Sequence, residues 1–206
     1  MAAQAGAGGP DAAMIEAALS AAPVAALVLS PEPADERTQI NRVKQVAPRV
    51  QAHGTALMVA ASVEVAVRGG ADGVHVAYAR AAVEEAVSRL APARMVGVAG
   101  LRSRDDAMTA GECGCDYVMF GEPALSRREG TLALPPFAAV VDRVAWWAEL
   151  FEVPVIGYAP DLAGVAALAG AGADFVALGD AVWGHAEGPA AAMRLAHAAL
   201  ATGARA

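Results

Sequence analysis

The chain is poor in the features that mark several classes of protein. It has only two cysteines, Cys113 and Cys115, which are too few for a disulfide framework. Two thiols without other nearby ligands also make a poor zinc site. Aromatic residues make up 5% of the 206 residues, while hydrophobic residues reach 56%. The apolar content is therefore mostly alanine, valine and leucine, which suits close packing of helices on a sheet.

Long hydrophobic runs and an excess of positive charge are also missing. A membrane-spanning helix takes about 18 or more apolar residues, but the run after Asp161 is cut by Asp174 and the run Ala21–Leu29 ends at Ser30. The N-terminus lacks a basic stretch followed by an apolar one, so no signal peptide is expected. The net charge of -7 does not suit a phosphate backbone. We therefore expect a cytoplasmic protein with no nucleic acid or membrane partner.

Short apolar segments alternate with longer amphipathic ones along the chain. Because the apolar runs are continuous, they predict strands that are buried on both faces of a parallel sheet. These strands are expected at Val24–Leu29, Ala56–Ala60, Gly73–Val76, Met95–Val98, Tyr117–Phe120, Val153–Gly157 and Phe175–Leu178. Helices are expected between them, at Met14–Ala21, Asp35–His53, Ala79–Leu90, Asp105–Gly111, Phe137–Phe151, Leu162–Ala169 and Gly188–Leu200. Asp35, Ser103 and Asp161 occupy expected N-cap positions.

Three joints between a helix and a strand repeat one pattern. Residues 69–74, 114–118 and 172–176 each place a glycine and an aspartate just before the strand. A repeated βα unit of this kind predicts an α/β fold of the (β/α)8 TIM barrel type. The first strand would precede Met14, but residues 1–13 contain no β-branched run. We interpret residues 1–13 as a flexible N-terminal segment and 14–206 as a single barrel domain, with an absent or atypical first strand.

The order and spacing of these motifs resemble the thiamine phosphate synthase family. The resemblance extends from about Met14 to the C-terminus and is carried by Ala52–Val59, Val63–Gly70, Ala71–His75, Met95–Val98, Asp116–Gly121 and Gly172–Gly179. It implies a TIM barrel and a transferase of thiamine biosynthesis. Such an enzyme joins a pyrimidine diphosphate to a thiazole phosphate, and Mg²⁺ assists the departure of diphosphate.

Several positions that the resemblance makes functional carry other side chains here. The family has Asn-Asp after its third strand, where the aspartate binds Mg²⁺, but this chain has Ala60–Ala61. Arg80 falls near the place of a second metal carboxylate, and Leu29–Pro33 replaces a segment whose Arg and Lys grip the diphosphate. Ala159–Pro160 replaces a Gly-Gly that binds phosphate, and proline has no N–H to donate. The resemblance therefore leads us to expect neither a metal nor a cofactor.

Active sites of barrels lie at the carboxyl ends of the strands. The candidate catalytic residues there are Glu122, which directly follows Gly121, and Asp180. The structural alternatives are a salt bridge from Glu122 to Arg102 or Arg104 and a capping role for Asp180. Candidate residues for binding a substrate or an anion lie around the same ends, at His75, Arg102, Arg104, Arg127, Arg128, Tyr158 and Gly179.

The sequence thus predicts a divergent thiamine phosphate synthase-like barrel. We expect it to bind a phosphorylated or anionic small molecule and to lack ordinary Mg²⁺-dependent activity. An active synthase and a non-catalytic regulatory or ligand-binding barrel are the alternatives. If one side chain of Trp146–Trp147 is exposed, it would suit a contact between two copies of the chain, so a homodimer is also an expectation.

Overall fold

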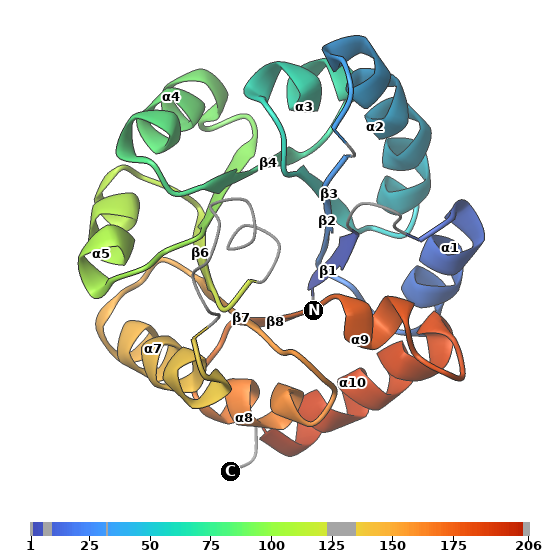
Figure 1. Ribbon diagram of the computed structural model, residues 1–206, viewed down its shortest axis with the longest axis vertical. Helices are drawn as coiled ribbons and strands as arrows, with labels where there is room; N and C mark the ends of the chain where they lie inside the picture. The colour runs from blue at the N-terminus through green and yellow to red at the C-terminus, as the bar shows by residue number, and fades with distance from the viewer. Residues whose placement is uncertain (1, 6–9, 32, 123–134, 204–206) are drawn as a thin grey trace.

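Eight parallel strands form a closed barrel in the computed structural model, which describes residues 2–5, 10–31, 33–122 and 135–203 (Figure 1). In order around the barrel, the strands are β1 (Ala2–Ala5), β2 (Ala26–Leu29), β3 (Ala56–Val59), β4 (Gly73–Ala77), β5 (Met95–Ala99), β6 (Tyr117–Phe120), β7 (Val155–Tyr158) and β8 (Phe175–Leu178). Each strand pairs with the next one in sequence. The predicted TIM barrel is therefore confirmed.

Strand β1 closes the barrel although its sequence is atypical of a strand. Ala3 lies opposite Leu27 of β2 on one side and opposite Leu178 of β8 on the other. Helix α1 then begins at Ala12, because the Asp11 side chain accepts the N–H of Met14 at 2.8 Å. This arrangement differs from the prediction of a flexible segment over residues 1–13. The pairing of neighbouring strands on both sides compensates for the low strand propensity of alanine and glutamine.

Helices surround the barrel as an outer layer (Figure 1). They are α1 (Ala12–Ala21), α2 (Glu36–Gln51), α3 (Val63–Gly69), α4 (Arg80–Leu90), α5 (Arg104–Glu112), α7 (Phe137–Leu150), α8 (Gly164–Gly170), the short α9 (Asp180–Trp183) and α10 (Pro189–Gly203). Asp35 and Ser103 cap α2 and α5 as predicted. Asp161 accepts the N–H of Gly164, the first residue of α8, although the N-cap residue itself is Ala163. Helix α3 had not been predicted.

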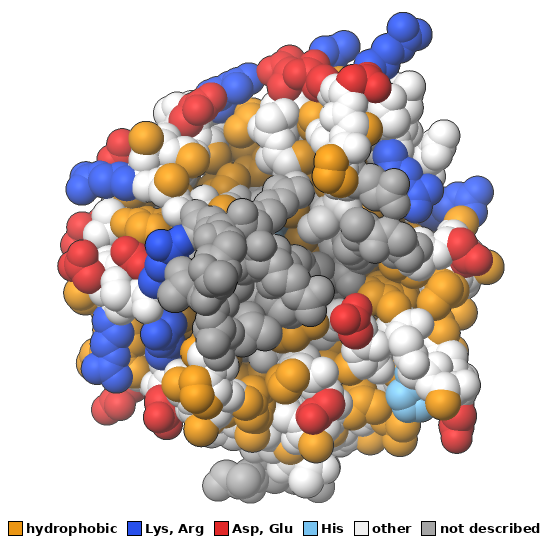
Figure 2. Space-filling model, in the orientation of Figure 1, with side chains coloured by type: hydrophobic (Ala, Val, Ile, Leu, Met, Phe, Trp, Pro, Cys, Tyr) orange, Lys and Arg blue, Asp and Glu red, His pale blue; other side chains and the backbone are white. Residues whose placement is uncertain are grey.

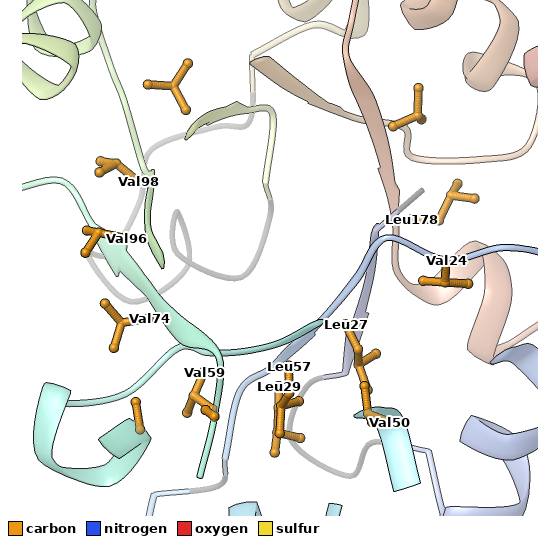
Figure 3. Close-up of a cluster of buried hydrophobic side chains, with 14 of the residues drawn as sticks. Val24, Leu27, Leu29, Val50, Leu57, Val59, Val74, Val96, Val98 and Leu178 are labelled. Carbon is orange, nitrogen blue, oxygen red and sulfur yellow. The ribbon is translucent and has the colours of Figure 1, made fainter. Parts of the chain in front are cut away.

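Strands β2 to β8 are buried on both faces, which explains their continuous apolar runs. Figure 3 shows Leu57, Val59, Val74, Val96 and Val98 on the outer side of the strands, where they face the helices. The alternate residues point into the barrel and form a second apolar cluster, which consists of Val28, Met58, Ala99, Tyr117, Met119, Ile156, Tyr158 and Ala177. Period-two alternation of side chains thus separates an outer core from the barrel interior.

The three repeated joints join neighbouring strands at the amino ends of the strands. The carboxylates of Asp72, Asp116 and Asp174 accept the backbone N–H groups of Leu57, Val96 and Val155 at 2.7, 2.7 and 2.8 Å. The N–H of each aspartate returns a bond to the carbonyl of the same strand residue. The glycine that precedes each joint has a positive φ, as at Gly70, where φ is 82°. At each joint, the aspartate and the strand residue therefore exchange two hydrogen bonds, and we call this pair of bonds a clasp. The clasps lie at the end of the barrel opposite the candidate site.

Charged side chains of both signs are interspersed over the outer helices (Figure 2). Arg68 pairs with Glu36 at 3.0 Å, and Arg89 pairs with Glu64 at 2.8 Å. None of the helices in the described part of the chain is long and apolar enough to cross a membrane.

Candidate functional site

One row of residues across three strands forms the floor of the candidate site. His75 of β4 lies opposite Gly97 of β5, and Gly97 lies opposite Tyr117 of β6. Because Gly97 has no side chain, the two rings reach across it and stack, with their centroids 5.7 Å apart and their planes at 21°. A Cβ at position 97 would lie 1.9 Å from Cζ of Tyr117. The glycine is therefore a steric requirement of this contact.

A buried chain of hydrogen bonds links three side chains. The Tyr117 hydroxyl lies 2.8 Å from Nδ1 of His75, and Nε2 of His75 lies 3.0 Å from Oε2 of Glu122. The exposed fractions of His75 and Glu122 are only 1% and 3%. Burial, followed by the charge of Glu122, raises the pKa of the Tyr117 phenol far above its ordinary value. The phenol therefore stays protonated and acts as a donor.

Glu122 reaches His75 because the chain turns inward after β6. Gly121 has a φ of 91°, a backbone conformation that residues other than glycine rarely adopt. A Cβ at Gly121 would also lie 2.9 Å from Cγ1 of Val140 in helix α7. The sequence places Glu122 over the barrel mouth, with Arg102 or Arg104 as the alternative partner. The structure shows it buried beside His75, a partner that the sequence did not indicate.

Tyr158 and Gly179 lie together at the carboxyl ends of β7 and β8. Both residues are buried, and Tyr158 belongs to the interior cluster of the barrel. A Cβ at Gly179 would lie 2.5 Å from the Tyr158 hydroxyl oxygen. The absence of a side chain at position 179 therefore allows this hydroxyl to reach β8.

The arginines at the start of α5 are exposed and differ in their surroundings. The guanidinium of Arg104 lies over the ring of Trp146 in α7, 4.7 Å from its centroid. The backbone N–H groups of Arg102 and Ser103 donate to the carboxylate of Asp106, and Ser103 Oγ accepts the N–H of Asp106. The capping box thus occupies the N–H groups of Arg102, Ser103 and Asp106 at this helix end.

Two other predictions have different outcomes. Asp180 is the exposed first residue of α9, and Gly179 is the N-cap residue. Because the N-cap residue is Gly179, Asp180 does not occupy the N-cap position that the capping interpretation gave it. Arg127 and Arg128, which were predicted to bind an anion, lie outside the described residues.

The donor set at the end of β3 does not fit Mg²⁺. Ala60 and Ala61 directly follow β3 and present methyl groups, whereas Mg²⁺ binds to oxygen. Arg80 is exposed and pairs with Glu84 within α4 at 2.8 Å. Among residues 10–31, 33–122 and 135–203, no group of three His, Cys, Asp or Glu side chains is placed to hold a metal ion.

Tyr117 belongs to the site but is not among the candidates that the sequence predicts. The sequence marks it only as the start of a buried strand. The alternation of side chains along β6 could have identified it, because the strand places Tyr117 and Met119 inside the barrel and Val118 and Phe120 outside. The strand register then brings Tyr117 beside Gly97, and register was not available from the sequence.

Comparisons of the sequence with known proteins agree on one family, and a solved structure shares the fold. A family model described as thiamine monophosphate synthase matches residues 2–182. The thiamine-phosphate synthase of Rhodospirillum centenum is 36% identical over 182 residues, which are 87% of this chain and 85% of that protein. The protein of the same name from Hyphomonas neptunium is 33% identical over 186 residues, which are 87% and 82% of the two chains. The structure of thiamine phosphate pyrophosphorylase from Pyrococcus furiosus is similar in fold, with a TM-score of 0.81 at 20% identity over 98% of this chain and 96% of that one.

Proposed function

Because this chain belongs to the thiamine monophosphate synthase family, we propose that it is a divergent member that binds a phosphorylated or other anionic small molecule at the barrel mouth. In this proposal it does not displace diphosphate with the help of Mg²⁺. The observation that carries the proposal is the pair Ala60–Ala61 at the carboxyl end of β3, where the family resemblance calls for a metal-binding carboxylate.

Two neighbouring features support the absence of metal-assisted chemistry. Arg80, near the place of the second carboxylate, carries a charge that repels a cation. The buried carboxylate of Glu122 is already hydrogen-bonded to His75. Catalysis depends on the groups in the site and not on the fold that carries them. The shared barrel architecture is therefore compatible with a changed reaction.

The anion-binding part of the proposal rests on the cations around the same strand ends. Arg104 is the first residue of α5 and Arg102 directly precedes its N-cap, and the sequence places Arg127 and Arg128 in the connection that follows β6. Guanidinium groups bind phosphate and carboxylate oxygens through paired hydrogen bonds. Glu122 is the candidate acid–base group, with His75 beside it. A cytoplasmic location and a homodimer are part of the same proposal.

An active synthase is the second candidate, and the relatives favour it. Proteins named thiamine-phosphate synthase share 36% and 33% identity with this chain over most of its length. A third candidate is a non-catalytic regulatory or ligand-binding barrel. Such a barrel would bind its ligand through the same arginines but would catalyse no reaction, so Glu122 would have no acid–base role.

The test of synthase activity is a direct assay. We expect the purified protein, mixed with the pyrimidine diphosphate and the thiazole phosphate, to release no diphosphate either with or without Mg²⁺. The relative from Rhodospirillum centenum serves as the positive control. Mg²⁺-dependent product formation, or growth of a thiamine auxotroph that carries this chain in place of its synthase, would establish the second candidate and overturn the proposal.

The test of anion binding is calorimetric titration with the thiazole phosphate and with inorganic diphosphate. We expect Arg102→Ala to weaken binding about tenfold, which corresponds to about 1.4 kcal/mol. Arg42→Ala, a change at an exposed arginine of α2, is the matched control and should leave binding unchanged. Equal binding by both variants would remove Arg102 from the anion site.

The variant Glu122→Gln distinguishes an enzyme from a ligand-binding protein once a catalysed reaction has been found. Loss of that reaction with unchanged ligand binding would show that Glu122 takes part in catalysis.

A further inference from the structure

We propose that Tyr117 is a positioning residue that fixes the proton of His75 on Nε2, so that His75 is neutral and Glu122 is held as an ionised, oriented carboxylate. The inference rests on the proposed function only for the use of Glu122 as the acid–base group. The protonation pattern itself follows from the contacts of three side chains.

The first step concerns the phenol. Tyr117 is 8% exposed, and a buried hydroxyl group needs a hydrogen-bond acceptor. Within the part of the chain that the structure describes, its hydroxyl makes one hydrogen bond, to Nδ1 of His75 at 2.8 Å. Because burial keeps the phenol protonated, Tyr117 donates and Nδ1 accepts. Nδ1 therefore carries no hydrogen.

The second step concerns the other ring nitrogen. A neutral imidazole without a hydrogen on Nδ1 carries it on Nε2. Nε2 lies 3.0 Å from Oε2 of Glu122, so the N–H donates to a carboxylate oxygen. Glu122 is thus an acceptor for the ring N–H of His75.

The two competing protonation patterns leave the phenol badly placed. An imidazolium would direct an N–H from Nδ1 at the Tyr117 oxygen. A protonated Glu122 that donates to Nε2 would move the ring hydrogen to Nδ1 with the same result. In either case the O–H of Tyr117 would lose the acceptor it has among the described residues. The neutral pattern is the one in which every donor in the chain meets an acceptor.

The backbone holds this geometry in place. The ring of His75 is stacked on that of Tyr117. The Tyr117 ring leaves no room for a side chain at position 97, on the strand between them. Neither ring can turn away without opening the packed interior of the barrel.

The test is nitrogen NMR of protein labelled with ¹⁵N at histidine, recorded at neutral pH without ligand. His75→Gln identifies the His75 signals among those of the four histidines. We expect the shift of an unprotonated nitrogen at Nδ1 and that of an N–H at Nε2. If the protein without substitutions shows two protonated nitrogens in His75, or an N–H at Nδ1, the proposal is overturned.

The variant Tyr117→Phe removes the donor and keeps the ring. We expect the two nitrogen shifts of His75 to move toward each other, because the Tyr117 hydroxyl no longer holds Nδ1 as an acceptor. Tyr78→Phe is the matched control, since Tyr78 follows β4 and its hydroxyl makes no hydrogen bond among the described residues. Unchanged His75 signals in Tyr117→Phe would contradict the role of Tyr117. Unchanged signals from the other three histidines show that the variant is folded. As no ligand is used, failure of this inference is distinct from failure of the proposed function.

Discussion

Gly97 shows how a missing side chain shapes the barrel interior. His75 and Tyr117 come from strands that are not neighbours, and they meet because the strand between them presents only a hydrogen atom. Glu122 completes the chain from beyond the end of β6. At the scale of single residues, the candidate site therefore depends on the packing around this position.

The first prediction concerns this packing. Gly97→Ala would place a Cβ 1.9 Å from Cζ of Tyr117, so the tyrosine must move and the interior must repack. We expect a loss of about 1–3 kcal/mol in the free energy of unfolding, measured with urea. The control is Gly170→Ala, where the nearest atom in the way is the Gly203 carbonyl oxygen at 3.7 Å. A Gly97→Ala variant as stable as this control would contradict the steric argument.

The second prediction concerns Cys115. Burial, followed by the neighbouring charge of Asp116, raises the pKa of the Cys115 thiol from 9.0 to about 12. Above pH 9 the unfolded chain loses the thiol proton while the folded chain keeps it. The stabilisation is therefore complete below about pH 9 and falls as the pH rises toward 12, by at most about 1.4 kcal/mol per pH unit.

Urea unfolding between pH 7 and pH 11 measures this slope. We expect Cys115→Ala, normalised to its own stability at pH 7, to lose less stability at alkaline pH than the natural chain does. A residual slope is expected from Tyr117, whose pKa is also raised by burial. Parallel curves for the two proteins would exclude Cys115 as a cause.

At the scale of elements, the clasps at the amino ends of the strands are the repeated device. Asp72, Asp116 and Asp174 each follow a helix and bind the backbone of the neighbouring strand in both directions. A carboxylate in this place fixes where the helix ends and which strand residue lies beside the joint. The same short motif thus sets the geometry of alternate βα units.

The third prediction follows from these clasps. Asp116→Ala leaves the N–H of Val96 without its carboxylate acceptor, and a hydrogen bond to a charged group contributes about 1.5–3 kcal/mol. We expect a loss of that size in the free energy of unfolding by urea. Asp142→Ala, at an exposed position of α7, is the control and should change stability by less than about 0.5 kcal/mol. Equal effects of the two changes would show that the clasp does not stabilise the barrel.

At the scale of the whole molecule, closure of the barrel depends on four residues near the N-terminus. Strand β1 occupies the place between β2 and β8, and without it both strands would present unpaired edges. The same closure brings the carboxyl ends of the eight strands into one ring.

The fourth prediction tests this closure. Ala3→Pro removes a backbone N–H from the strand that seals the barrel, so we expect lower stability in urea and a tendency to aggregate in size-exclusion chromatography. Ala12→Pro is the control, because Ala12 is the first residue of α1, where proline is tolerated. If the two variants behave alike, β1 does not close the barrel in solution.

The sequence by itself determined the strand positions from β2 to β8, the caps of α2 and α5 and the repeated joints, because these depend on local patterns of burial and hydrogen bonding. It also marked His75 and Glu122 as candidates from their positions in and beyond strands. Only the tertiary structure decided that Ala2–Ala5 is a strand, because alanine has little strand propensity and the partners on both sides supply the pairing. It alone decided that Tyr117, His75 and Glu122 form one chain, since strand register and the space above Gly97 are properties of the closed barrel.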